Sequence, residues 1–494
     1  MAQITIIGLG PGSKAALTLE AWEILQQAEE VWLRTAHHPV LRSISTAGQW
    51  HSFDAVYEEA DTFDAVYTQI VAEVLRLGRR PEGAIYAVPG HPLVGESTVT
   101  RILTAAERES IPVHVVHGVS FVEPSLTALN VDALDGLQIS DALDIVALHH
   151  PPLNPDLPAL IGQVYSRAVA SELKLVLMNQ YPDEHPVALL DAAGTERERV
   201  QRLPLYEIDR HEASMLTSLY VTPMASVSGF EGFQETIATL RSPDGCPWDR
   251  DQTHATLRTN LLEECYEVLE AIDADDPLAL REELGDLLLQ IVLHTQIAVE
   301  EGDFYMPEVI AHIDAKLKRR HPHVWGGVDV SGVDDVVVNW ETIKQRERTE
   351  KGTGERSMLR GIPLALPSLA QAAAYADRAG RIGFDKIDAA GIWVELPEKV
   401  RHLLQALLDS LDELWNADGD GTQGNGQVLG DLLLVIADWA RRHDTDPEST
   451  LREANARFAG RFHTLEIASR KMEASLQTLS PDLIRRLWEN REQS

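Results

Sequence analysis

The pattern of apolar residues changes near residue 225, and this change limits the possible folds more than any other feature of the chain. Before it, short apolar runs alternate with helical patterns. The runs are ITIIGLG (4–10), AIYAVPG (84–90), VHVVHG (113–118), DIVALHH (144–150) and LKLVLMNQ (173–180). Buried strands that alternate with helices predict an α/β domain, here over 1–225. After residue 230 strand patterns nearly vanish, so the remainder of the 494 residues is expected to be all-α.

The helical region contains an internal repeat. The hexapeptide LGDLLL occurs at 284–289 and again at 429–434, each time ahead of a long helical pattern. A repeated helical segment indicates two similar units packed together. We therefore predict one unit over 230–350 and a second over 358–475.

The segment NLLEECYEVLEAI, residues 260–272, is expected to be a helix with acidic residues along one side. Glu263 and Glu267 are four residues apart, and Glu264 and Glu267 are three apart. At this spacing the three carboxylates can converge on one point. Taken alone, the pattern is also that of an ordinary solvated helix face.

The next helical segment, LREELGDLLLQIVLH (280–294), is apolar almost all round and is therefore expected to be buried. Glu283 and Asp286 nevertheless share one narrow stripe of it. Carboxylates beside a buried face need partners, and Mg²⁺ prefers carboxylate oxygens and bridges to phosphates. Spacing alone leaves two interpretations open: a Mg²⁺ site or a stripe that faces solvent.

The order Glu-Glu-x-x-Glu, then Glu-x-x-Asp, resembles the MazG family of all-α nucleoside triphosphate pyrophosphohydrolases. GCPWDRDQTHATLR, KLKRRHPHVWG and NWETIKQRER are similar to MazG segments and stand in the same order. The resemblance implies Mg²⁺-dependent hydrolysis of NTP or dNTP to the monophosphate and pyrophosphate, as in nucleotide-pool housecleaning. One outer carboxylate, such as Glu264, would accept a proton from water. The family's metal-binding, catalytic carboxylates fall on Glu263, Glu264, Glu267, Glu283 and Asp286.

Other residues resemble the substrate-binding part of this family. Lys316, Arg319 and Arg320 match its phosphate-contacting basic cluster, although cations also stabilise a helix C-terminus without any ligand. Trp248 and Trp340 are candidates for stacking on a base, and as aromatic residues they are equally suited to a core.

The second copy departs from the acidic pattern. When the two LGDLLL segments are aligned, only Asp431 retains its acidic character. Val, Leu and Ala cannot hold Mg²⁺, so we predict a degenerate copy that completes the helical bundle. The replaced positions are Val428 for Glu283, and His402, Leu403 and Ala406 for the three upstream glutamates.

The N-terminal ITIIGLGPGS is a strand that runs into a glycine-rich turn, without full dinucleotide-binding spacing. With YAVPGHPLVGEST, VVHGVSFVEPSLTALN and LMNQYPDEHPVALL it resembles the tetrapyrrole methylase family over 1–225. The resemblance implies S-adenosylmethionine binding in a cleft between two α/β lobes. His91 stands where many members carry Asp. The matching cofactor positions are Gly8, Gly10, Pro11, Gly12, Gly90, Pro92, Ser120 and Met178.

Together the two halves resemble the YabN-type fusion of these families, for which several functions stay open. The methylase half could be the enzyme, with the MazG half as a scaffold or nucleotide sensor, or both folds could serve only assembly. A net charge of −34 argues against a general nucleic-acid or membrane binder. Two cysteines, Cys246 and Cys265, predict a reducing cytoplasm. The repeat could pair within one chain, or a homodimer could supply the pairing.

Overall fold

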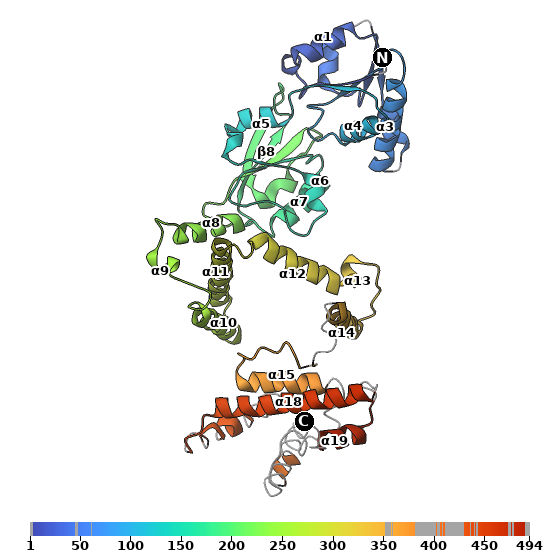
Figure 1. Ribbon diagram of the computed structural model, residues 1–494. Helices are drawn as coiled ribbons and strands as arrows, with labels where there is room; N and C mark the ends of the chain where they lie inside the picture. Colours follow the sequence, from blue (N-terminus) through green and yellow to red (C-terminus); the bar gives the residue numbers. More distant parts are fainter. Residues whose placement is uncertain are drawn as a thin grey trace. The chain divides into compact units, whose positions relative to one another are not determined.

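The computed structural model shows two compact units, Met1–Val309 and Ile310–Ser494 (Figure 1). None of the helices in the described ranges combines the length and the hydrophobicity that a bilayer-spanning segment requires. The structure describes residues 3–44, 48–60, 62–350, 357, 359–380, 402, 406–407, 409–410, 429–434, 436–438, 440, 443–472, 476 and 479–489.

The first lobe of the N-terminal half is a parallel five-stranded sheet in the order β3-β2-β4-β1-β5. The strands are β1 (Ile4–Gly8), β2 (Glu30–Leu33), β3 (Gln49–Ser52), β4 (Ala84–Val88) and β5 (Val113–Val116). The connecting helices are α1 (Leu19–Gln27), α2 (Asp54–Glu59), α3 (Phe63–Gly78) and α4 (Ser97–Arg108).

Both faces of this sheet are covered, because side chains alternate along each strand. Ile4 and Ile6 of β1 enter a core shared with α3 and α4, whereas Ile7 and Leu9 enter the core that contains α1. The apolar run that begins at Ile4 is therefore buried on both sides, as a central parallel strand should be.

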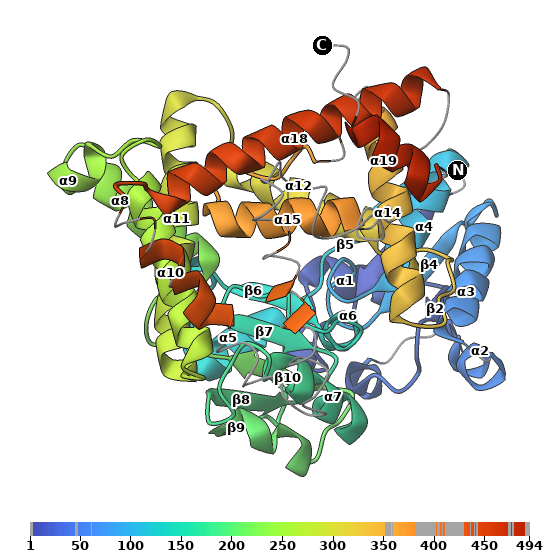
Figure 2. The ribbon, with the colours of Figure 1, turned by 90° about the horizontal axis from the view of Figure 1, so that it is seen from below.

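The second lobe is a mixed sheet in the order β6-β7-β10-β8-β9, whose strands lie side by side in Figure 2. β6 and β7 are parallel, and the other neighbours are antiparallel. Its strands are β6 (Gln138–Asp141), β7 (Ala159–Gly162), β8 (Pro186–Asp191), β9 (Arg199–Pro204) and β10 (Thr217–Val221). Its helices are α5 (Val122–Leu129) on one face, with α6 (Ala142–Val146) and α7 (Arg167–Leu177) on the other.

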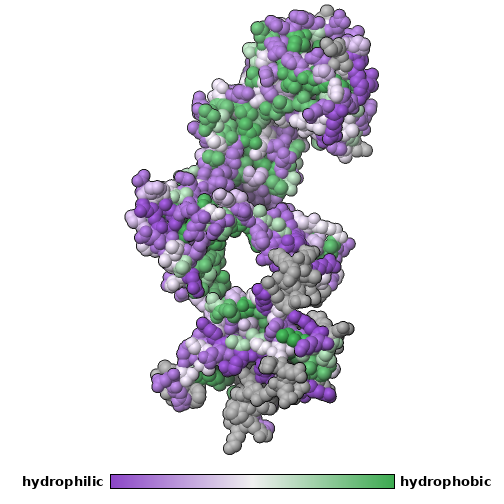
Figure 3. Space-filling view, in the orientation of Figure 1, coloured by the Kyte–Doolittle hydropathy of each residue, from purple (hydrophilic) through white to green (hydrophobic). Residues whose placement is uncertain are grey.

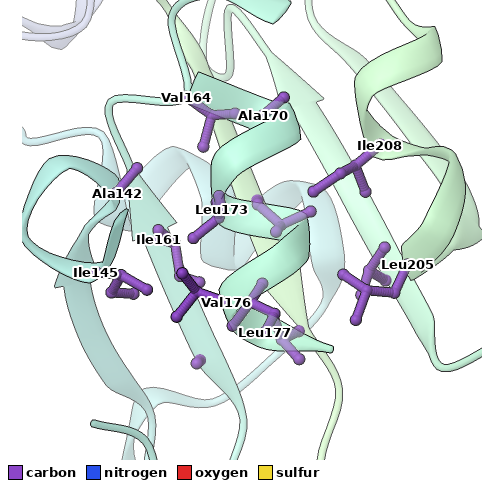
Figure 4. Packing of buried hydrophobic residues seen from close by; sticks show 14 of the residues in the cluster. Ala142, Ile145, Ile161, Val164, Ala170, Leu173, Val176, Leu177, Leu205 and Ile208 are labelled. Carbon is purple, nitrogen blue, oxygen red and sulfur yellow. The ribbon is translucent and has the colours of Figure 1, made fainter. Parts of the chain in front are cut away.

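Two of the expected strands are helical. LKLVLMNQ lies in α7 and the turn after it, and DIVALHH begins inside α6. A short continuous apolar run fits a buried helix as well as a buried strand. Ser166 caps α7 by accepting a hydrogen bond from the Val169 amide at 3.2 Å. The helix then buries Ala170, Leu173 and Leu177 against the sheet (Figure 4).

The helical part of the first unit follows directly on the second lobe. It contains α8 (Phe230–Arg241), α9 (Pro247–Arg250), α10 (Arg258–Asp273) and α11 (Pro277–Glu301), and α12 (Met306–Arg320) begins in it. Its core contains Ile237 of α8, Leu257, and Val292, Leu293 and Ile297 of α11.

Helix α8 is attached to the second lobe through its N-terminus, where its N-cap residue Gly229 has no side chain. Asp156, in the loop before β7, caps it instead, because its Oδ1 accepts from the amides of Ser228 at 2.6 Å and Gly229 at 2.9 Å. Asn154 in the same loop donates to Glu231 at 3.3 Å. Side chains of the α/β half thus complete the first helix of the helical half.

The second unit is also helical. A compact core joins Tyr375 and Ala379 to Phe458, Phe462 and Trp488. Its further helices are α13 (Pro322–Trp325), α14 (Val333–Glu350), α15 (Ser368–Gly380), α18 (Pro447–Lys471) and α19 (Pro481–Glu489).

Candidate functional site

The acidic residues lie on a hairpin of two helices, α10 and α11. Asp276 caps α11 by accepting from the amides of Leu278 and Ala279 at 2.9 and 3.1 Å, with Pro277 at the first helical position. A connection this short places the two helices side by side and antiparallel. Glu267 and Glu283 are equally far from the connection 274–276, so they meet across the hairpin.

Three carboxylates converge at this point. One oxygen each from Glu264, Glu267 and Glu283 lies within 4.8 Å of the others. Among the described residues, this is the group of potential metal ligands that lie this close together. Asp286 completes the local charge, since it interacts electrostatically with both Glu264 and Glu283. Glu263 is exposed and lies outside the converging three.

Electrostatics at the cluster disfavour four ionised carboxylates without a cation. Partial burial and then the negative charges of Asp286 and Glu267 raise the pKa of Glu264. Burial and then Glu267 and Asp286 raise the pKa of Glu283. Glu270, which the sequence motif did not include, also repels Glu283. Its position one turn after Glu267 is the signal that could have placed it there.

The carboxylates fit a hard divalent cation. Oxygens around Mg²⁺ at about 2.1 Å are separated by about 3 to 4.2 Å, so a cluster that spans up to 4.8 Å needs only a small contraction. The oxygen-only donor set suits Mg²⁺ rather than zinc. These observations support the metal interpretation of the acidic stripe.

The apolar side of the hairpin differs from expectation. The buried residues of α11 all lie in its C-terminal half, whereas Leu284 and Leu288 in the N-terminal half are 50% and 38% exposed. On α10, Leu269 and Ile272 are each 53% exposed, and Ala271 is its one fully buried residue. Figure 3 shows hydrophobic side chains gathered on the exposed side of α11. The core shared with α8 covers the C-terminal half of α11, and packing against α10 leaves the apolar N-terminal half incompletely covered.

The predicted basic cluster lies near the end of α12. Arg319 and Arg320 both bind Glu347 of α14, through Nε at 2.7 Å and Nη2 at 2.8 Å respectively. Hydrogen bonding from Arg320, and then from Arg319, lowers the pKa of Glu347 to about 2. Lys316 is half-buried one turn earlier. The cluster is thus held by one carboxylate and keeps further N–H donors for a ligand.

The two tryptophans differ in their surroundings. Trp248, on α9, is 58% exposed. Trp340, on α14, has its ring edge-on to His321 with 5.0 Å between ring centroids, and its indole nitrogen is buried without a hydrogen-bond partner. A buried N–H of this kind is available to a polar ligand atom.

The second copy is described only in part. Asp431, His402 and Ala406 are exposed helical positions, and Leu403 and Val428 lie outside the described residues.

In the N-terminal half, the glycine loops meet at the carboxyl ends of three neighbouring strands. Gly10 and Gly90 exchange backbone hydrogen bonds at 3.2 and 2.9 Å. A Cβ atom on Gly8 would lie 2.6 Å from the Gly90 carbonyl oxygen and 2.7 Å from the Cα of Gly118. The loops therefore leave no room for side chains, and backbone can approach a ligand closely here.

The other predicted cofactor residues are divided between the lobes. Pro11 and Gly12 continue the first loop, Pro92 follows Gly90, and buried Ser120 follows β5. Met178 instead follows α7 in the second lobe and is 38% exposed.

Two histidines contact the glycine loops. His38, which no motif indicated, is buried, and its Nε2 donates to the Gly10 carbonyl at 3.0 Å. Burial lowers its pKa to about 4, so it is neutral. His91 accepts the Leu93 amide through Nδ1 and lies parallel to His117 with ring centroids 5.8 Å apart.

Two family models match the chain. Residues 3–209 match the tetrapyrrole (corrin/porphyrin) methylases, and residues 252–325 match the MazG nucleotide pyrophosphohydrolase domain. The second match contains the acidic hairpin from α10 to α11.

Relatives cover the whole chain or its helical half. The Bacillus subtilis protein YabN is 36% identical over 496 residues, which span 98% of this chain and 97% of YabN. The nucleoside triphosphate pyrophosphohydrolase/pyrophosphatase MazG of Thermotoga maritima is 37% identical over 260 residues, or 53% of this chain and 94% of the relative. The nucleoside triphosphate pyrophosphohydrolase of Escherichia coli K12 is 39% identical over 237 residues, or 47% and 86%.

Proposed function

This chain belongs to the YabN family, in which a tetrapyrrole methylase domain precedes a MazG domain, and we propose that its MazG domain hydrolyses nucleoside triphosphates. The products are the nucleoside monophosphate and pyrophosphate, the reaction depends on Mg²⁺, and its role is nucleotide-pool housecleaning. The convergence of Glu264, Glu267 and Glu283 within 4.8 Å, beside Asp286, carries this proposal. The names of the Thermotoga and Escherichia relatives support the substrate class.

We assign cation binding and proton transfer to different carboxylates according to their surroundings. Glu267, Glu283 and Asp286 hold the cation, which when bound neutralises phosphate charge and makes water a better nucleophile. Glu264 has a raised pKa and takes the proton from the attacking water at its carboxylate oxygen. The exposed Glu263 extends the same acidic face. A raised pKa, which Glu264 shares with Glu283, makes a carboxylate a better proton acceptor.

We assign binding of the substrate's phosphates to the basic cluster at the end of α12, and binding of its base to the two tryptophans. Lys316, Arg319 and Arg320 contact phosphate oxygens, and the arginines do so with the N–H groups that Glu347 leaves unused. Trp340, with its unpartnered indole N–H, and the exposed Trp248 are the stacking candidates for the base.

The test is release of pyrophosphate from a panel of NTPs and dNTPs, with Mg²⁺ or with EDTA. We expect Mg²⁺-dependent formation of pyrophosphate and monophosphate in equal amounts. The matched variants are Glu267→Gln, which should abolish release, and Asp431→Asn in the second copy, which should leave it nearly unchanged. No release from any nucleotide by folded protein would refute the proposal, and equal loss in both variants would refute the inert second copy.

The methylase domain has a second candidate function, binding of S-adenosylmethionine for methyl transfer. The close approach of Gly8, Gly90 and Gly118 supports it, because this is where backbone can contact a cofactor. Equilibrium dialysis with labelled S-adenosylmethionine tests it, and Gly90→Val is the variant expected to lose binding. Absence of binding at millimolar cofactor would remove this function and leave the MazG domain as the enzyme.

A further inference from the structure

Two histidines that are forty residues apart in sequence share one hydrogen bond beside the acidic hairpin. His254 lies in the turn before α10, and His294 lies on α11. Their Nδ1 atoms are 2.8 Å apart, and the rings are nearly parallel, with centroids separated by 5.1 Å. The bond links the start of one carboxylate-bearing helix to the middle of the other.

The turn that carries His254 is well ordered by its own bonds. Thr253 and Thr256 exchange hydrogen bonds, each amide to the other's hydroxyl, at 2.9 and 3.2 Å. Leu257, which follows, is buried in the core beside Leu293 and Ile297, the residues on either side of His294 along α11. The histidine pair and Leu257 therefore fasten one short turn to one position on α11.

This fastening matters because α10 has few other deep contacts. Ala271, near its C-terminus, is its one fully buried residue, and the connection to α11 follows three residues later. Glu264 and Glu267 lie between that end and the turn at 254–257. The two ends of α10 therefore act together with its packing along α11 to set the approach of these carboxylates to Glu283.

The hydrogen bond has a definite proton arrangement. One Nδ1 must carry a proton and the other must not. Either Nδ1 can be the donor, because the roles depend on the tautomer of each ring. His254 Nε2 lies 3.9 Å from the Glu301 carboxylate. Burial and then the neighbouring His254 lower the pKa of His294. A proton on both Nδ1 atoms would set two N–H groups against each other.

Among the described residues, His254 is the hydrogen-bond partner found for the His294 side chain. Arg241 of α8 is bound to Glu300 at 2.7 Å and to the Gln252 carbonyl at 3.2 Å, which fastens the same loop independently of pH near neutrality. The charged residues nearest to the pair in sequence are Asp249 and Arg250 on α9, Asp251 in the turn, Arg258 at the start of α10, Glu301 on α11 and Asp303 after it. The acidic residues of the carboxylate site lie farther along α10 and α11.

We propose that the His254–His294 hydrogen bond is a positioning element for the carboxylate site, which holds the start of α10 on α11 and opens when both imidazoles are protonated. The proposal rests on the proposed hydrolase function and adds a determinant of its pH range. His254 and His294 touch neither substrate nor cation; they act through the position of Glu264 and Glu267.

Two variants separate a positioning role from a general structural one. His294→Phe keeps ring volume but removes the Nδ1 atom that shares the hydrogen bond. His254→Asn keeps an amide near the Nδ1 position that donates to neutral His294 or accepts from its charged form, so the bond survives protonation. The matched control is His114→Asn, an exposed histidine on β5.

The first readout is kcat and KM for pyrophosphate release between pH 5.5 and 8, at saturating Mg²⁺. We expect His294→Phe to lose about tenfold in kcat at pH 7.5, the scale of a small misplacement of catalytic groups. His254→Asn should stay within about twofold of wild type at pH 7.5 and lose the fall in kcat between pH 7 and 5.5 that wild type and the control show. An unchanged acid limb in His254→Asn would overturn the proposal.

The second readout does not require activity. Amide hydrogen exchange of residues 251–262 is measured in EDTA at pH 5.5 and 7.5, with correction for intrinsic rates. Wild type and control should exchange about fivefold faster at the lower pH, the effect of losing one hydrogen bond, and His254→Asn should not. Equal pH sensitivity in all three proteins would also overturn the proposal. If wild type released no pyrophosphate at any pH, the hydrolase function would fail while this readout still decided the histidine pair.

Discussion

Replacing Glu267 by Gln should stabilise the acidic hairpin without metal and destabilise it, relative to wild type, with metal. Glu267 and Glu264 have carboxylate oxygens no more than 4.8 Å apart. Two unit charges at that distance repel by about 0.9 kcal/mol in water, and by less at physiological salt. Gln removes this repulsion and keeps the size and shape of the side chain. In EDTA, α10 should therefore open less readily in the variant.

With metal bound, wild type should have the more stable hairpin and Glu267→Gln the less stable one. A cation present at one hundred times its dissociation constant stabilises the site by about 2.7 kcal/mol, which exceeds the repulsion that wild type carries without it. The variant lacks one ligand and gains little. The repulsion in metal-free wild type also depends on pH. Because the pKa of Glu264 is raised in the folded protein, the repulsion is absent below about pH 4.5 and grows as the pH rises through the pKa of the folded state.

The assay is amide hydrogen exchange of α10, which reports local opening rather than unfolding of the whole chain. At pH 7.5 and low salt we expect the variant to be better protected in EDTA, and wild type to be better protected in Mg²⁺. A salt titration in EDTA should reduce the difference. Faster exchange of the variant in EDTA, or equal protection of both proteins by Mg²⁺, would show that these acids are a solvated face.

Three further results are expected. Asp286→Asn should abolish Mg²⁺-dependent pyrophosphate release and Asp431→Asn should change turnover less than about twofold, measured side by side on proteins with matching circular dichroism. Glu347→Gln should speed exchange of the last turn of α12 about threefold at pH 7; because the pKa of Glu347 is lowered from 4.5 to about 2, the wild-type protection should be complete above about pH 4.5 and be lost progressively as the pH falls from there toward 2. Gly118→Ala places a Cβ atom 2.2 Å from the Gly90 carbonyl, so it should cost about 2 kcal/mol in the first lobe and lower S-adenosylmethionine binding in dialysis, unless that loop has another conformation.

Hydrophobic periodicity was sufficient to predict the class of each half, since the described residues contain an alternation of strands and helices followed by helices. It failed at LKLVLMNQ, where Leu173 and Leu177 are buried from a helix rather than a strand. A run of adjacent apolar residues satisfies both periods, and the cap at Ser166 that decides between them acts from outside the run.

Helical spacing also predicted most of the acidic group. Glu264 and Glu267 share a face of α10 by the three-residue rule, and the same rule pairs Glu283 with Asp286 on α11. The exposure of Glu263 could not be predicted, because it depends on how α10 is rotated against its neighbour. No spacing rule connects His254 to His294 either, since their contact arises only from tertiary packing.

The cap that Asp156 provides has a consequence for how the protein can be divided. The Pro-, Gly- and Ser-rich stretch before residue 230 has the composition of a linker, yet a Cβ atom on Gly229 would lie 2.4 Å from Asn154 and 2.8 Å from Asp156. A fragment that began at this stretch would start with an uncapped helix, and the excised α/β half would keep a carboxylate whose amide partners had left. The connection between the two halves is thus fixed by side-chain hydrogen bonds and is not a flexible linker. Separate expression of the two halves would remove the hydrogen bonds that Asp156 and Asn154 make to the residues at the start of α8, and any shift of the loop before β7 would move α8 with it.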